Sequence, residues 1–304
     1  MIDTTNLTKR FDEETAVEGL DLSVEEGSVH GFVGPNGAGK TTTMKMLVGL
    51  LEPTEGEALI DDEPAGSVAA KRRIGYSPQE LSLYDSMTAR RYLRFMGRTA
   101  GMSKADARER SDELLEWIDL EDAADRAVGG YSGGMKRRVS LAQAMIHDPD
   151  LLILDEPTTG LDPAGRQTIM DALESLPEEG MTVFVSSHVL AELEQYIDSV
   201  TIVRDGTHVV TDSIDAVQDE HGGEAFAIET DDNERVRAIL ADHALVNSVE
   251  VDDEELLVMT EQPDEFRQQF QQLLVDEGIS LRSLTEEGTL QEAFTDIIEA
   301  GDAE

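Results

Sequence analysis

A short glycine-rich segment ending in lysine and threonine restricts this chain more than any other feature. The segment, Gly34-Pro35-Asn36-Gly37-Ala38-Gly39-Lys40-Thr41, fits the pattern G-x-x-x-x-G-K-[ST]. An apolar run at residues 28–33 precedes it, and a helical pattern follows at residues 41–50. In such a strand, loop and helix, backbone N–H groups cradle phosphates, the lysine reaches the terminal phosphates and the threonine hydroxyl holds Mg²⁺. We therefore expect a phosphate-binding loop here, with Thr42 beside it, in an α/β fold.

A second signal of a phosphate site is an apolar run that ends in two carboxylates. Residues 151–154 read as a buried strand, and Asp155 and Glu156 follow directly. A buried carboxylate needs a cation or hydrogen bonds to offset its desolvation. We therefore expect Asp155 to support Mg²⁺ through a water molecule. A further buried strand is predicted at residues 181–185, and both strands suit a mainly parallel sheet.

Three more short motifs complete an ordered series, namely Gln79 after Pro78, Ser132-Gly133-Gly134, and His188 after Ser187. Together with the phosphate loop and Asp155-Glu156, the series resembles the ATPase subunit of an ABC transporter. The resemblance covers about residues 1–218. It implies a P-loop NTPase core with a helical subdomain at about residues 88–147, where the sequence has a mainly helical stretch interrupted near Gly129-Gly130.

The resemblance also implies catalytic roles. In this family the residue at Glu156 polarises the attacking water, that at His188 contacts the γ-phosphate, and that at Gln79 lies between the two subdomains. Gln79 is expected to bind Mg²⁺ together with Thr41 and Asp155. Each residue also has an alternative interpretation when it is taken without the other motifs. Glu156 would then be an exposed carboxylate at a helix start, Gln79 a turn residue, and His188 a structural histidine. Phe11 matches the aromatic residue that stacks on adenine, with core packing as the alternative.

The segment Ser132-Gly133-Gly134-Met135 resembles the family signature, which usually has Gln where Met135 stands. That departure is common in the drug- and antibiotic-export branch. Glycines let the backbone approach a phosphate, and the helix after them directs its positive end toward the anion. In the family this motif contacts ATP bound by a second subunit, which implies a head-to-tail homodimer with two ATP at the interface. Asp162 matches the loop that joins the two sites.

The charge balance restricts both partners and environment. The chain has 65 acidic and 24 basic residues and a formal net charge of −41, yet 39% of its residues are hydrophobic, which argues against disorder. Because repulsion among carboxylates destabilises a compact state unless salt screens it, we expect a salt-rich cytosol, as in a halophilic archaeon. Nucleic acid is not an expected partner, since binding a phosphate backbone needs a basic face.

The remaining bulk features suit a cytoplasmic protein. A length of 304 residues accommodates one large domain or two modest ones. No apolar run approaches the ~20 residues that cross a bilayer. There is no cysteine, and hence no disulfide framework or thiolate metal site. We expect a peripheral location on the cytoplasmic face of the membrane, through an integral membrane permease subunit.

The pattern changes after about Ala216, so we expect an ABC ATPase domain at residues 1–218 and an accessory domain at residues 219–304. The second domain is predicted to be a small ferredoxin-like α+β fold of order β-α-β-β-α-β. Its expected elements are Ala225–Glu229, Asn233–Ala241, Val246–Val251, Glu255–Met259, Asp264–Asp276 and Ser280–Leu284.

Three classes of function remain open. The first is the ATP-hydrolysing subunit of an ABC-2 type exporter, favoured because Thr289-Leu290-Gln291-Glu292-Ala293-Phe294 resembles an ending typical of drug- and antibiotic-efflux ATPases. The second is a soluble ABC ATPase of translation or DNA repair, which usually has tandem cassettes or a long coiled-coil insertion. The third is an importer ATPase, usually with a different C-terminal domain. For a transporter, residues 79–95 would form the groove for the coupling helices of the permease.

Overall fold

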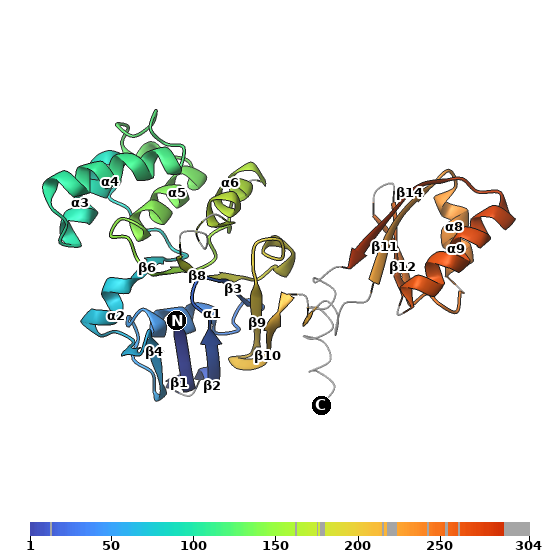
Figure 1. Ribbon diagram of the computed structural model, residues 1–304, viewed down its shortest axis with the longest axis horizontal. Helices are drawn as coiled ribbons and strands as arrows, with labels where there is room; N and C mark the ends of the chain where they lie inside the picture. Colours follow the sequence, from blue (N-terminus) through green and yellow to red (C-terminus); the bar gives the residue numbers. More distant parts are fainter. Residues whose placement is uncertain are drawn as a thin grey trace. The chain divides into compact units, whose positions relative to one another are not determined.

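Two compact units, Met1–Ile214 and Asp215–Glu304, make up the chain (Figure 1). The computed structural model describes residues 1–12, 14–161, 163–174, 176, 180–214, 216–217, 224–241, 243–252, 255–260 and 262–288. Thr289–Phe294 and Asp162 lie outside the described residues. Within the described part of the chain, no helix has the length and apolar character needed to cross a membrane.

A six-stranded sheet of order β10-β9-β3-β8-β7-β6 forms the centre of the first unit. Its strands are parallel except for β10, which pairs antiparallel with β9. The predicted strands at residues 28–33, 151–154 and 181–185 are confirmed as β3, β7 and β8. The strands are β3 (Val29–Val33), β6 (Ile74–Ser77), β7 (Leu151–Leu154), β8 (Thr182–Ser187), β9 (Ser199–Arg204) and β10 (Thr207–Ser213).

A second, antiparallel sheet of order β2-β1-β4-β5 was not predicted from the sequence. The pairing of β1 with β2 shifts register three times between Thr4 and Arg10. Such irregularities break the alternation of apolar and polar residues that identifies a strand. The strands are β1 (Ile2–Phe11), β2 (Glu14–Val24), β4 (Glu55–Ile60) and β5 (Glu63–Pro64).

Helix α1 (Lys40–Leu47) connects the two sheets through one apolar core. Its Met44 and Leu47 are fully buried in a cluster that also holds Ile2 of β1 and Phe184 of β8. The helix was expected to reach residue 50 but ends at Leu47, because Gly49 adopts a left-handed conformation with φ 67°. The phosphate loop that precedes α1 is therefore anchored on a packed element.

A helical region follows β6 and contains α3, α4 and α5. Each of these helices begins at a hydroxyl residue, Thr88, Ser103 or Ser132, whose side chain accepts a backbone N–H of the first turn. The bounds are α2 (Val68–Arg73), α3 (Ala89–Thr99), α4 (Lys104–Trp117), η1 (Val128–Gly130), α5 (Gly133–Ala144), α6 (Pro163–Glu174) and η3 (Leu190–Glu192).

The second unit has the predicted β-α-β-β-α-β order and a four-stranded antiparallel sheet, β12-β13-β11-β14. This strand order is that of a ferredoxin-like fold, which confirms the predicted fold class. Both helices pack on one face of the sheet, where Phe226, Phe266 and Phe270 are buried (Figure 1). The elements are β11 (Glu224–Thr230), α8 (Asn233–Leu240), β12 (Ser248–Asp252), β13 (Glu255–Thr260), α9 (Pro263–Glu277) and β14 (Leu281–Gly288).

Candidate active site

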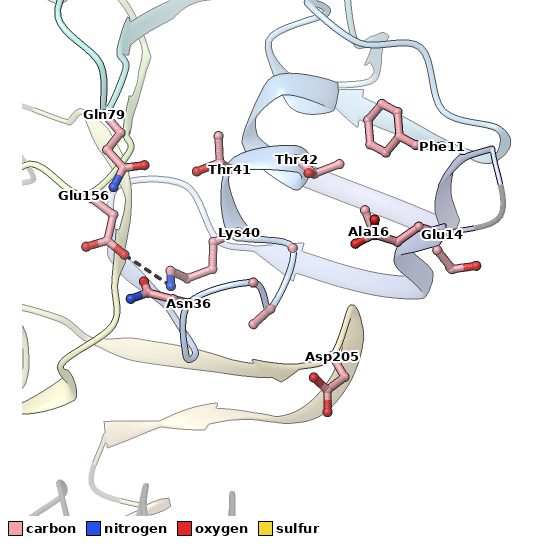
Figure 2. Close-up of a pocket in the computed structure, with 14 residues that line it drawn as sticks. Phe11, Glu14, Ala16, Asn36, Lys40, Thr41, Thr42, Gln79, Glu156 and Asp205 are labelled. Carbon is pink, nitrogen blue, oxygen red and sulfur yellow. Dashed lines mark ion pairs between the residues drawn. The ribbon is translucent and has the colours of Figure 1, made fainter.

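A pocket of about 570 Å³ opens beside the phosphate loop and collects most of the residues that the motifs singled out (Figure 2). It is lined by Phe11, Glu14, Thr15, Ala16, Asn36, Gly37, Ala38, Gly39, Lys40, Thr41, Thr42, Gln79, Glu156 and Asp205. Figure 2 shows Lys40, Gln79 and Glu156 at one end of this pocket and Phe11, Glu14 and Asp205 at the other. The pocket is therefore long, with different chemistry at its two ends.

The loop needs glycine for two separate reasons. Gly37 and Gly39 both have φ 90°, a left-handed conformation that other residues rarely adopt. A Cβ atom on Gly39 would also lie 2.4 Å from the Ala16 carbonyl oxygen, and one on Gly34 would lie 2.2 Å from that of Val203. Gly34 and Pro35 do not line the pocket; their carbonyl oxygens accept hydrogen bonds from Lys40 Nζ at 2.6 and 3.2 Å.

Lys40 and Glu156 form a buried ion pair, with 3.2 Å between Lys40 Nζ and Glu156 Oε1. Glu156 is only 4% exposed and lies two residues after the end of β7, so it is not an exposed carboxylate at a helix start. Burial raises the pKa of its carboxyl, but hydrogen bonds from His188, Thr159 and Lys40, with the positive charge of Lys40, outweigh burial and hold that pKa below its ordinary value. Glu156 is therefore an ionised carboxylate next to the phosphate loop.

Asp155 lies at the end of β7, where its Oδ1 accepts hydrogen bonds from Thr41 Oγ1 at 3.1 Å and Ser186 Oγ at 3.2 Å. Its other oxygen, Oδ2, is buried without a hydrogen-bond partner. Burial, with the neighbouring charge of Glu156, raises the pKa of Asp155 despite those two hydrogen bonds. An unpaired buried carboxylate oxygen beside a threonine hydroxyl is the donor chemistry that Mg²⁺ prefers.

His188 and Gln79 both lie near this acidic centre. His188 Nδ1 is 2.7 Å from Glu156 Oε2, although the ring is exposed and does not line the pocket. Gln79 lines the pocket as an exposed residue just after β6. The structure thus brings His188 to Glu156 directly and Gln79 to the same end of the pocket.

Phe11 is 45% exposed at the end of β1, so the alternative that it packs in the core is wrong. Its ring faces the ammonium group of Lys9, with 5.2 Å between Lys9 Nζ and the ring centroid. An exposed ring on the wall of the pocket can stack on a planar group.

Four pocket residues, Glu14, Thr15, Ala16 and Asp205, were missed by sequence reasoning. Asp205 occupies the turn between β9 and β10, with φ 48°. The turn packs against β2, because Gly206 O accepts a hydrogen bond of 2.7 Å from the backbone N–H of Glu18. An Asp-Gly pair between apolar runs does indicate a hairpin, but not which distant strand its turn will contact.

The signature residues lie at a different pocket, of about 510 Å³, lined by Asp119, Ser132, Gly133, Gly134, Met135, Arg138, Gly160, Leu161, Gly165 and Thr168. The Ser132 side chain caps α5 by accepting the Met135 N–H at 3.2 Å. A Cβ atom on Gly133 would have no heavy atom within 4 Å, so the backbone there is open to an incoming group. This chain does not bring Ser132 to its own phosphate loop.

Comparisons with known sequences extend over almost the whole chain. The family model described as "ABC transporter" matches residues 17–159. The Nod factor export ATP-binding protein I of Burkholderia lata is 39% identical over 269 residues, which are 88% of each chain. The bacitracin transport ATP-binding protein BcrA of Bacillus licheniformis is 33% identical over 305 residues, or 99% of this chain and 98% of the relative.

Solved structures also resemble this chain over much of its length. The ATP-binding subunit of an ABC transporter matches with a TM-score of 0.66 and 28% identity over 72% of this chain and 92% of its own. The ATP-binding cassette MJ0796, solved as a dimer in a post-hydrolysis state bound to ADP and phosphate, matches with a TM-score of 0.65 and 28% identity, over 70% of this chain and 99% of its own. By these relatives and this fold, the chain belongs to the ABC transporter family of ATP-binding proteins.

Proposed function

We propose that this chain binds and hydrolyses ATP as the energising subunit of an ABC exporter. The observation that carries the proposal is the single pocket that holds the phosphate loop, Gln79 and the ionised Glu156. Lys40 and the loop N–H groups bind the phosphates, and Phe11 stacks on adenine at the opposite end. Glu156, steadied by His188 Nδ1, accepts the proton of the attacking water.

Thr41, Asp155 and Gln79 are the residues that would hold Mg²⁺, with Asp155 acting through water. When bound, Mg²⁺ neutralises the charge of the phosphates. Mg²⁺ keeps several waters and binds through one or two carboxylates together with substrate phosphates, so a dedicated cluster of protein ligands is not needed.

Two substitutions test the chemistry. Glu156→Gln keeps the shape of the side chain but cannot accept the proton, so it should bind Mg-ATP and lose turnover by about 100-fold or more. Lys40→Ala should lose both binding and turnover. ATP binding is measured by calorimetry and turnover by phosphate release. Wild-type turnover in purified Glu156→Gln protein, with contaminating ATPase excluded, would disprove the role of Glu156.

We further propose that the active form is a head-to-tail dimer, in which Ser132, Gly133 and Gly134 of one chain contact the ATP bound by the other. The support is that these residues lie at a pocket of their own, away from the phosphate loop. MJ0796, a structural relative, forms a nucleotide-bound dimer. The role proposed for Asp162 is to join the two sites.

Light scattering tests the dimer. Glu156→Gln protein should become dimeric in Mg-ATP, because it binds nucleotide without hydrolysing it. Adding Ser132→Arg should prevent this shift, since the larger side chain would fill the phosphate position. An ATP-dependent dimer that persists in the double variant would contradict the arrangement.

Export is proposed from the relatives, whose names refer to Nod factor export, bacitracin transport and linearmycin resistance. The ABC-2 type is proposed from the sequence Thr289-Leu290-Gln291-Glu292-Ala293-Phe294, which resembles an ending typical of drug- and antibiotic-efflux ATPases. The partner would be an integral membrane permease, which would hold the chain at the cytoplasmic face of the membrane.

The groove in which this permease would dock is proposed at residues 79–95, where Tyr84 and Phe95 are 54% and 44% exposed and contact each other edge to face. Exposed aromatic side chains of this kind mark interaction surfaces. Co-purification of a permease, lost on Tyr84→Asp, is the expected result.

We also propose that the protein works in a salt-rich cytosol. The support is the formal net charge of −41 in a chain with a packed apolar core.

A further inference from the structure

Helix α5 is attached to strand β6 and the residues after it by three contacts on one helix face. Arg137, Ser140 and Ala144 are spaced at i, i+3 and i+7, which places them on the same side of the helix. The Ser140 hydroxyl is 2.9 Å from that of Ser77, and a Cβ atom on Gly75 would lie 2.3 Å from the Ala144 carbonyl oxygen. The contact with Gly75 shows that the two backbones approach directly.

Arg137 forms the third contact, which is the one nearest the candidate active site. Its two terminal nitrogens donate hydrogen bonds to the Pro78 carbonyl oxygen at 2.9 Å and to the Gln79 carbonyl oxygen at 3.0 Å. The side chain is only 5% exposed. Burial lowers the pKa of its guanidinium, while the negative charges of Asp155 and Glu156 act in the opposite direction. A buried cation whose N–H groups donate hydrogen bonds to backbone carbonyl oxygens holds those carbonyl groups in place.

Arg137 therefore links two parts of the proposed machinery that lie far apart in sequence. Its carbonyl partners belong to Gln79, on the wall of the ATP pocket, and to Pro78 before it. Its own helix begins at Gly133, directly after the capping Ser132. The guanidinium therefore connects the Gln79 backbone directly to the first turns of α5, where the signature residues lie.

We propose that Arg137 is a positioning residue that couples occupancy of the ATP pocket, sensed at Gln79, to the orientation of Ser132, Gly133 and Gly134 toward the second copy. The inference rests on the proposed function, because it assumes that the partner's ATP meets the signature residues. Arg137 itself lines neither the ATP pocket nor the pocket of the signature residues.

The first test compares Arg137→Met, Arg137→Lys and Lys136→Met in the Glu156→Gln background. Arg137→Met should leave the affinity for Mg-ADP unchanged, because Arg137 does not line the pocket in which the nucleotide would bind. It should raise the ATP concentration needed for dimerisation about tenfold, equivalent to about 1.4 kcal/mol. Arg137→Lys should remain impaired, because one ammonium cannot reproduce the fork of two donors. Lys136→Met is the matched control, since Lys136 forms an ion pair of 3.1 Å with the exposed Asp85.

The second test measures the coupling within one chain. Because the chain has no cysteine, Glu57→Cys on β4 and Glu116→Cys on α4 accept spin labels without background. Pulsed electron paramagnetic resonance should show a distance that shifts with Mg-ATP in the parent and in Lys136→Met. In Arg137→Met the shift should be lost while the thermal unfolding midpoint still reports a folded protein.

The outcomes separate the inference from the function on which it rests. If the Glu156→Gln parent does not dimerise in Mg-ATP, the proposed dimer fails. If the parent dimerises and Arg137→Met matches it in ATP dependence and in the spin-label distances, the dimer stands and the role of Arg137 is overturned.

Discussion

At the scale of single residues, Asp155 combines a cost to folding with a proposed role in binding Mg²⁺. Its pKa is raised mainly by burial, and one of its oxygens has no hydrogen-bond partner. When an acid has a higher pKa in the folded chain than in the unfolded chain, the folded protein becomes less stable as pH rises from the unfolded pKa through the folded pKa. At neutral pH and without Mg²⁺, the ionised Asp155 carboxylate therefore destabilises the fold.

Asp155→Asn should stabilise the metal-free protein while abolishing ATP turnover. The amide oxygen can still accept the hydrogen bonds from Thr41 and Ser186, but the buried charge is gone. We expect the thermal midpoint at pH 7 in chelator to rise by about 2–4 °C, the shift for about 1 kcal/mol in a domain of this size. Asp150→Asn, at an exposed carboxylate just before β7, is the control and should leave both stability and turnover nearly unchanged. A lower midpoint in Asp155→Asn would contradict this account.

At the scale of elements, β3 carries a histidine that is held neutral by the sheet around it. His30 is 1% exposed, with Nδ1 2.7 Å from Ser199 Oγ and Nε2 2.8 Å from Thr201 Oγ1, both on β9. Its ring stacks on Phe184 of β8. Burial lowers the pKa of His30 from 6.5 to about 4. The unfolded chain therefore binds this proton more tightly than the folded chain does.

The consequence is a loss of stability in mild acid. As pH falls from about 6.5 to about 4, His30 becomes protonated in the unfolded chain but stays neutral in the folded chain. Over this range the free energy of unfolding falls by about 3 kcal/mol. His30→Gln keeps an amide that can bond the two hydroxyls but does not titrate, so its unfolding free energy should fall less over this range. Urea unfolding at pH 7, 5.5 and 4.5 measures the difference between the two proteins, which cancels the common titration of the carboxylates. Parallel pH profiles would show that His30 does not titrate in this way.

Elements also show what sequence reasoning can reach. The phosphate loop, Asp155 and Glu156 were predictable, because each motif specifies its chemistry within a few adjacent residues on one strand or turn. The second unit was predictable because the sequence shows its strands and helices as separate short segments in a β-α-β-β-α-β order. Asp205 was not, because it reaches the pocket only through a turn that packs on β2. Arg137 was not, because its role follows from a contact between α5 and a segment 58 residues earlier.

At the scale of the whole molecule, acidic charge exceeds what the chain can neutralise internally. Basic side chains do form ion pairs, such as Arg90 with Asp112 and Asp125 and Arg94 with Asp112. Yet 24 basic residues face 65 acidic ones, so most carboxylates have no cation available. Exposed ion pairs contribute only ~0–1 kcal/mol each, and salt weakens them. The repulsion among the remaining carboxylates is therefore the larger electrostatic effect on folding.

Salt should consequently stabilise this protein. The screening length falls from ~10 Å at 0.1 M salt to ~3 Å at 1 M, which removes repulsion between carboxylates on a compact surface while the apolar cores of both units are unaffected by screening. We expect the thermal midpoint to rise steadily from 0.1 M to 2 M KCl and ATPase activity to be poor at the low end. NaCl should act like KCl, because screening depends on ionic strength and not on the identity of the cation. If exposed ion pairs dominated instead, the midpoint would fall as salt screens them, and a flat or falling midpoint would remove the grounds for a salt-rich cytosol.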